Sequence, residues 1–167
     1  MKTQKRRSIF SYYRPYQALF WSDMFFAVLG AGIVLAIPLI VRYITNTVVY
    51  LPGKEPLHKI LELGAVMMVM VLIEAFCNFY IAYFGHIMGA KIEHDMRNEI
   101  FAHYQKLSFH FYDNQKVGQL LSRITNDLFD ISELLHHGPE DVVISLIKFV
   151  GSFVILLSIN AKLTCGQ

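Results

Sequence analysis

The sequence has few charged residues, and this scarcity excludes an ordinary soluble domain. Only 17% of its 167 residues are charged, whereas 54% are hydrophobic, and the mean hydropathy is +0.41. A soluble domain needs a largely polar or charged surface, so this composition indicates a membrane protein. The formal net charge of +2 says little as a total, and no nucleic-acid partner is expected.

Cysteine is also scarce, and a phosphate-binding loop is missing. Cys77 and Cys165 give neither a disulfide framework nor a metal-ligand spacing. The sequence contains no Gly-x-x-x-x-Gly-Lys-Ser/Thr stretch, and the closest fragment, residues 85–91, falls in a predicted helix without a loop that could cradle phosphates. We therefore expect this chain alone to be no enzyme, to bind and hydrolyse no ATP, and to hold no cofactor or metal.

Three long apolar stretches predict three membrane-spanning helices. Residues 24–41 carry no charge and exceed the ~7–15 residues of a signal-peptide core. We expect a first span over about 21–50, after an interfacial elbow over about 8–20 whose aromatic rings favour the headgroup layer. An unbroken helix over about 57–108 would reach about 78 Å, and the hydrocarbon core is only ~30 Å thick, so much of it must project into the cytoplasm. A third helix is expected over about 124–160.

The projecting part of the second helix is amphipathic. The spaced pairs Lys91/Asp95 and Glu93/Arg97 would each add only about 0.2–0.5 kcal/mol to the helix. The helix therefore needs helical neighbours against its apolar stripe, which consists of Ile92, Met96, Ile100, Tyr104 and Leu107.

Glycine and proline mark further features of these helices. Gly85 and Gly89 have a spacing that lets helices approach closely. Pro38 is expected to form a packing kink in the first span. Gly138-Pro139 precedes the apolar run 142–159, so the third helix either begins at Pro139 or carries a kink there.

The distribution of basic residues predicts the orientation in the membrane. The loop around residues 51–56 holds one lysine, Lys54, whereas basic residues crowd both the N-terminus and the middle segment. By the positive-inside tendency, the N-terminus and the middle segment are cytoplasmic and the Pro52-Gly53 loop is external.

Residues 109–130 form the one long stretch that is too polar to bury and too patterned to be a slack linker. Asp113 and Asn114 could cap the start of a helix by accepting from free backbone N–H groups. Apolar residues then recur at helical spacing, while Lys116, Gln119 and Arg123 face the other way; the apolar residues are Val117, Leu120, Leu121 and Ile124. This predicts an amphipathic helix of about two turns, held by a partner surface because Gly118 weakens it by about 1 kcal/mol.

The segment FYDNQKVGQLLSRITND resembles the first cytoplasmic loop of exporter-type ABC transporter membrane domains, and the similarity extends from Tyr13 to Thr164. The resemblance implies an all-α membrane protein with an interfacial elbow, three long transmembrane helices with cytoplasmic extensions, and one short coupling helix over about 114–122. It also implies that this loop contacts a nucleotide-binding domain through Asp113, Asn114, Gln115, Lys116, Val117, Gly118, Gln119, Leu120, Ser122 and Arg123. An ordinary solvated connector is the alternative.

The resemblance further implies the N-terminal half of an exporter of drugs, lipids or other amphiphiles in a bacterial plasma membrane. The expected partners are the lipid bilayer, the remaining transmembrane helices and a nucleotide-binding domain that would hold ATP and Mg, in a homo- or heterodimer of half-transporters. Neither an ABC signature nor a fourth span is present. We therefore expect a fragment that is inactive alone.

Two charges lie deep in the predicted spans. An unpaired carboxylate there costs at least ~2.5 kcal/mol, so Glu74 needs a partner, water or a proton. Counting residues along the helices puts Glu74 and Lys148 at similar depths, which predicts an ion pair between them. Arg42 is a second candidate partner, and a charge that lines a substrate cavity is the functional alternative.

Two other classes of protein remain open. A stand-alone membrane protein that docks on a transporter and regulates it would also need the short crossing helix. A haem or metal redox enzyme is suggested by six histidines, but their spacing is irregular, so surface or packing roles are expected; these are His86, His94, His103, His110, His136 and His137. A Glu93/Asp95/Glu99 cation site is disfavoured, because alternating charges usually form a solvated helix face.

Overall fold

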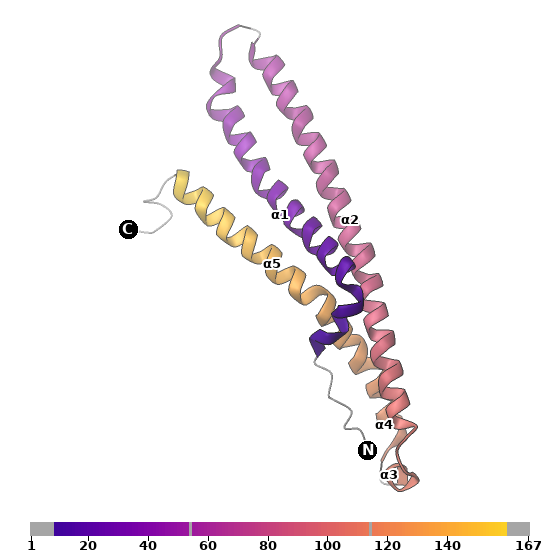
Figure 1. Ribbon diagram of the computed structural model, residues 1–167. Helices are drawn as coiled ribbons and strands as arrows, with labels where there is room; N and C mark the ends of the chain where they lie inside the picture. The colour runs from indigo at the N-terminus through magenta and orange to yellow at the C-terminus, as the bar shows by residue number, and fades with distance from the viewer. Residues whose placement is uncertain (1–8, 54, 114, 160–167) are drawn as a thin grey trace, which may run out of the picture. The chain divides into compact units, whose positions relative to one another are not determined.

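The computed structural model describes residues 9–53, 55–113 and 115–159, and within these ranges the regular structure is entirely helical. A 3-10 helix, η1 (Ile9–Tyr16), leads into α1 (Gln17–Asn46), and a second short 3-10 helix, η2 (Val48–Tyr50), precedes α2 (Glu55–Tyr104). Figure 1 then shows two short helices, α3 (Phe109–Asp113) and α4 (Val117–Ser122). A π-helical segment, η3 (Arg123–Asp127), leads into α5 (Leu128–Ile159). The prediction of an all-α fold is confirmed.

Three helical stretches of the described chain are long and apolar enough to cross a membrane. They are Ser11–Tyr50, Glu55–Tyr104 and Val117–Ile159. The second contains α2, which is a single helix of 50 residues, as the absence of breaks predicts. The third contains α5, which does not begin at Pro139 but continues through it. This excludes the alternative that the third helix begins at Pro139.

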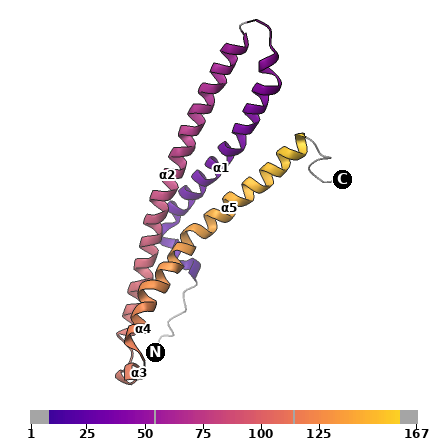
Figure 2. The same cartoon turned by 180° about the vertical axis from the view of Figure 1, so that it is seen from behind.

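The chain divides into two compact units. One unit comprises, of the described residues, 24–53, 55–82 and 140–159, and α1 and α2 lie side by side in it, as Figures 1 and 2 show from opposite sides. The rings of Phe26 and Tyr80 lie 4.1 Å apart between centroids. A Cβ on Gly30 would sit 3.5 Å from the Cβ of Cys77. The connection between the helices bends at Gly53, whose φ of 73° is readily adopted only by glycine.

Large apolar side chains cover the outside of this unit. Leu72, Phe79 and Phe149 are all exposed in the chain by itself. A soluble protein rarely shows so continuous an apolar surface, whereas a surface of this kind is stable against lipid or further helices.

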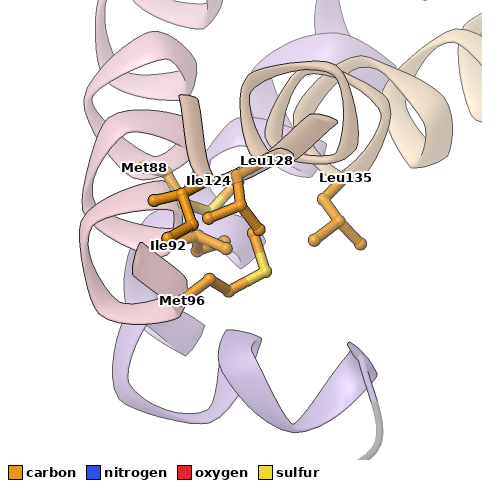
Figure 3. Close-up of a cluster of buried hydrophobic side chains, with 6 residues drawn as sticks. All are labelled: Met88, Ile92, Met96, Ile124, Leu128 and Leu135. Atoms are coloured by element: carbon orange, nitrogen blue, oxygen red, sulfur yellow. The ribbon is translucent and has the colours of Figure 1, made fainter. Parts of the chain in front are cut away.

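The other unit comprises, of the described residues, 9–23, 83–113 and 115–139. Its core is a cluster of buried side chains in which α2 supplies Met88, Ile92 and Met96 (Figure 3). The opposite side of this cluster comes from Ile124, Leu128 and Leu135. The predicted apolar stripe of α2 is confirmed from Ile92 to Tyr104, and its helical neighbours are η3, α5 and the N-terminal elbow. Leu107, which was predicted to continue the stripe, lies beyond the end of α2.

Hydrogen bonds and packing attach the elbow to this core. Tyr16 donates a hydrogen bond to Asp95 Oδ2 over 2.9 Å, and Tyr12 donates to Glu99 Oε2 over 2.8 Å. Tyr13 donates to the backbone carbonyl of Leu135. Each of these three rings packs against the core, and each hydroxyl has a partner within the unit. The interfacial placement of the elbow stays a prediction.

Of the two side-chain pairs predicted on α2, one forms and the other does not. Glu93 is paired with Arg97, as expected. Asp95 accepts from Tyr16 instead of pairing with Lys91, and the Lys91 Nζ atom lies 5.9 Å from the centre of the Tyr16 ring. Among the described residues, Lys91 and Asp95 form no ion pair.

Candidate functional site

The short helix α4 lies close to the C-terminal end of α2 (Figure 1). Its first turn is closed by the backbone of Lys116, whose carbonyl accepts from the N–H groups of Gln119 and Leu120 over 2.8 and 3.3 Å. Lys116 is the N-cap residue and makes no side-chain capping hydrogen bond. The prediction that Asp113 caps this helix is therefore wrong, because Asp113 is the last residue of α3. Asn114 lies outside the described residues.

The apolar stripe of α4 divides into a buried and an exposed part. Leu120 and Ile124 are buried, and Ile124 belongs to the core cluster of the unit. Val117 and Leu121 are 59% and 58% exposed. The helix is thus held by the protein on one side and offers two aliphatic side chains on the other.

A shallow apolar pocket of about 150 Å³ lies beside this stripe. Tyr112 of α3 borders it and donates a hydrogen bond to the backbone carbonyl of Tyr104 over 2.6 Å, which ties α3 to the end of α2. The other lining residues are Phe101, Tyr104, Gln105, Val117, Leu120, Leu121 and Ile124.

Polar side chains surround the exposed aliphatic pair. A Cβ added to Gly118 would meet no atom within 4 Å, so this part of α4 is open. The predicted polar contact residues on this surface are all exposed, and they are Asp113, Gln115, Lys116, Gln119, Ser122 and Arg123. A small apolar centre with a polar rim is typical of a protein-binding surface, and we refer to residues 113 and 115–123 as the α4 surface.

The α4 surface is joined directly to the long helices. From Arg123 to Asp127 the backbone is π-helical and continues into α5 without a loop. Ile124 belongs to the core cluster that contains residues of α2, and Leu120 lines the pocket beside the end of α2. A force on α4 would therefore act on both α2 and α5, because packed interiors transmit strain.

The structure gives Glu74 a local partner. Glu74 Oε1 accepts a hydrogen bond from Asn78 Nδ2 over 3.1 Å, one turn further along α2. No ion pair joins Glu74 to Lys148 in the part of the chain that the structure describes. The Glu74/Lys148 pair therefore stays a prediction.

The structure brings together three histidines that are dispersed in the sequence. His86 of α2 lies beside His136 and His137 of α5, and Glu133 is close to two of these rings. The buried carboxylate of Asp23 was not among the predicted site residues. One signal for the histidine cluster was present in the sequence. Glu133, His136 and His137 are spaced so that the carboxylate and both imidazoles share a helix face.

These features define an all-helical, multi-pass membrane protein with a short helix between its second and third long helices. A family model described as the ABC transporter transmembrane region matches residues 20–165. The chain therefore belongs to the ABC transporter transmembrane family, as the resemblance implied.

Known bacterial relatives match the same region. An uncharacterized ABC transporter ATP-binding protein, YwjA, of Bacillus subtilis (strain 168) is 43% identical over 157 residues, which are 94% of this chain and 27% of the relative. Putative multidrug export ATP-binding/permease proteins of Bacillus subtilis (strain 168) and Staphylococcus aureus (strain NCTC 8325 / PS 47) are 25% and 26% identical, over 90% of this chain and 27% of each relative. The chain thus spans about a quarter of the length of these relatives.

Proposed function

We propose that this chain is the first part of the transmembrane domain of an ATP-driven exporter, and that the α4 surface receives the movement of a nucleotide-binding domain. The observation that carries this proposal is the exposed pair Val117 and Leu121 on a helix whose other side is fixed in the core of its unit. A helix that only connected two spans would have no need of an outward apolar pair surrounded by polar residues.

The family supports the remaining parts of the proposal. ATP and Mg would bind to a nucleotide-binding domain and not to this chain, and two half-transporters would pair as a homo- or heterodimer around the transport path. The names of two relatives mention multidrug export, which favours amphiphilic substrates. The membrane would be the bacterial plasma membrane, with the N-terminus and the α4 surface in the cytoplasm and the residue 51–53 turn outside.

Site-specific photo-crosslinking in the native host tests the proposal. The photoreactive residue p-benzoylphenylalanine would replace Leu121 in the full chain as its gene encodes it. Mass spectrometry of the product should identify peptides of an ATP-binding domain, on the same polypeptide or on a separate one. The Val117→Asp substitution should lower the yield, because it places a charge in the centre of the contact.

The matched control carries the same photoreactive group at Tyr50. Tyr50 is 79% exposed and belongs to the turn between α1 and α2, so it should yield no ATP-binding peptide. Equal yields from the two positions would contradict the proposal. A regulatory protein is the alternative, and it would be indicated if Leu121 crosslinked to a transporter that still exports after this gene is deleted.

A further inference from the structure

Three histidine rings from two helices converge in the unit that contains the N-terminal elbow, the C-terminal part of α2 and the start of α5. The ring centroid of His86 lies 5.1 Å from that of His136 and 5.4 Å from that of His137. The centroids of His136 and His137 are 4.3 Å apart. One ring nitrogen of each histidine lies within 4.8 Å of the others. Rings this close leave no space for a porphyrin between them, but they suit a single shared ion.

A carboxylate accompanies the three rings. The oxygens of Glu133 lie 3.9 Å from His86 Nδ1 and 3.4 Å from His137 Nε2. Glu133 also precedes His136 by three residues on α5, which is the Glu-x-x-His spacing that places a carboxylate and an imidazole on one helix face for metal ligation. Three imidazoles and one carboxylate are a complete ligand set for a tetrahedral site.

A buried acid lies behind the central ring. Asp23 and His136 are both 1% exposed, and a carboxylate oxygen of Asp23 lies within 4.8 Å of a His136 nitrogen. Neither oxygen of Asp23 has a hydrogen-bond partner among the described residues. A buried carboxylate without such a partner is costly unless positive charge lies close by. Histidines that ligate a metal commonly direct their second ring nitrogen to a carboxylate.

The backbone of α2 makes room for this arrangement. A Cβ on Gly85 would lie 1.8 Å from His136 Cε1, so only glycine allows the ring to occupy its place. The absence of a side chain at this position brings His136 of α5 next to His86, the residue that follows Gly85 on α2.

We propose that His86, His136, His137 and Glu133 bind one divalent transition-metal ion of the zinc class, with Asp23 as the carboxylate that orients His136. Imidazole ligands suit zinc, copper, nickel and iron. Zinc–nitrogen distances of about 2.0–2.1 Å require ligand atoms closer together than 4.8 Å. His86 is exposed and His137 half-buried, so both rings can turn towards His136. The ion would then fasten α2 to α5 within this unit.

Metal binding by the full chain as its gene encodes it, purified in lipid nanodiscs and stripped with a chelator, tests the proposal. Zn²⁺ alone is titrated by calorimetry, and Co²⁺ alone is added to record the visible absorption of tetrahedral cobalt. We expect one Zn²⁺ for each chain and intense cobalt bands. His86→Gln and His137→Gln should each weaken zinc binding at least about 100-fold. Asp23→Asn should weaken it about 10–100-fold, as expected of an orienting carboxylate.

The control variant is His94→Gln. His94 is exposed on the same helix as His86, and its Nε2 lies 2.8 Å from Asn98 Nδ2. The His94→Gln substitution should leave the zinc affinity and the cobalt bands unchanged. Circular dichroism before metal is added verifies that each variant is folded. Equal zinc affinity in His137→Gln and His94→Gln would overturn the proposal, as would the absence of cobalt bands in a folded wild-type chain.

Discussion

The close approach of Gly85 to His136 makes a sharp prediction about stability. The Gly85→Ala substitution would place a Cβ 1.8 Å from Cε1, 2.6 Å from Nε2 and 2.7 Å from Nδ1 of the His136 ring. The ring is almost fully buried, so it cannot move away without opening the packing around it. Overpacking of this kind costs about 1–3 kcal/mol.

A matched substitution one turn away separates this steric cost from helix propensity. A Cβ on Gly89 would lie 3.5 Å from the Cβ of His136 and 3.8 Å from the Ser132 carbonyl oxygen, which are ordinary contacts. Both glycine-to-alanine changes gain about 0.8–1.0 kcal/mol of helix propensity. The difference in unfolding free energy between the two variants therefore isolates the overlap with His136, and Gly85→Ala should be the less stable by about 1–3 kcal/mol.

Thermal unfolding followed by circular dichroism in detergent, with a chelator present, measures this difference. A change of 1 kcal/mol corresponds to about 2–4 °C in Tm for a chain of this size, so Gly85→Ala should melt about 2–12 °C below Gly89→Ala. Combining Gly85→Ala with His136→Ala removes the overlap, and alanine at position 85 should then be stabilising. Equal Tm values for the two single variants would refute the close packing of Gly85 against His136.

Two further predictions concern polar partners of the helices. Tyr16→Phe should lower the free energy of unfolding by about 1–2 kcal/mol, because it removes a partly exposed hydrogen bond to a carboxylate. Chemical denaturation in wild-type and Asp95→Ala backgrounds measures this decrease in the free energy of unfolding. An equal decrease in both backgrounds would contradict a contribution from the hydrogen bond between Tyr16 and Asp95. If Glu74 and Lys148 pair, Glu74→Gln and Lys148→Met should each impair membrane insertion or expression and the double variant should restore it. Failure of the double variant to restore either would end the pairing hypothesis.

The long helices were predictable because hydropathy and length are local properties of the sequence. The unbroken segment after Pro56 predicted the long helix now seen as α2, and the stripe containing Ile92 and Met96 predicted a packed face. The capping of α4 was not predictable from side-chain preference. A backbone carbonyl closes the first turn, so the helix begins at Val117 without using the available acid, Asp113.

Contacts between distant segments were not predictable, because they depend on the register of one helix against another. Tyr12 and Tyr16 are one turn apart in the elbow and meet Glu99 and Asp95, which are one turn apart on α2 and run in the opposite direction. Each of these spacings is visible in the sequence, but no local sequence pattern indicates that the two tyrosines pair with these two carboxylates.

The histidine cluster depends on register in the same way, and a single glycine controls it. With Gly85 opposite His136, the next residue along α2 is His86 and the next along α5 is His137, so both rings lie next to the buried one. A shift of one helix by one residue would place a side chain where the ring now lies. The stability of Gly85→Ala and the zinc affinity of the chain therefore report on the same contact. If Gly85→Ala destabilises the fold, it should also weaken zinc binding, because a displaced His136 cannot share an ion with its two neighbours.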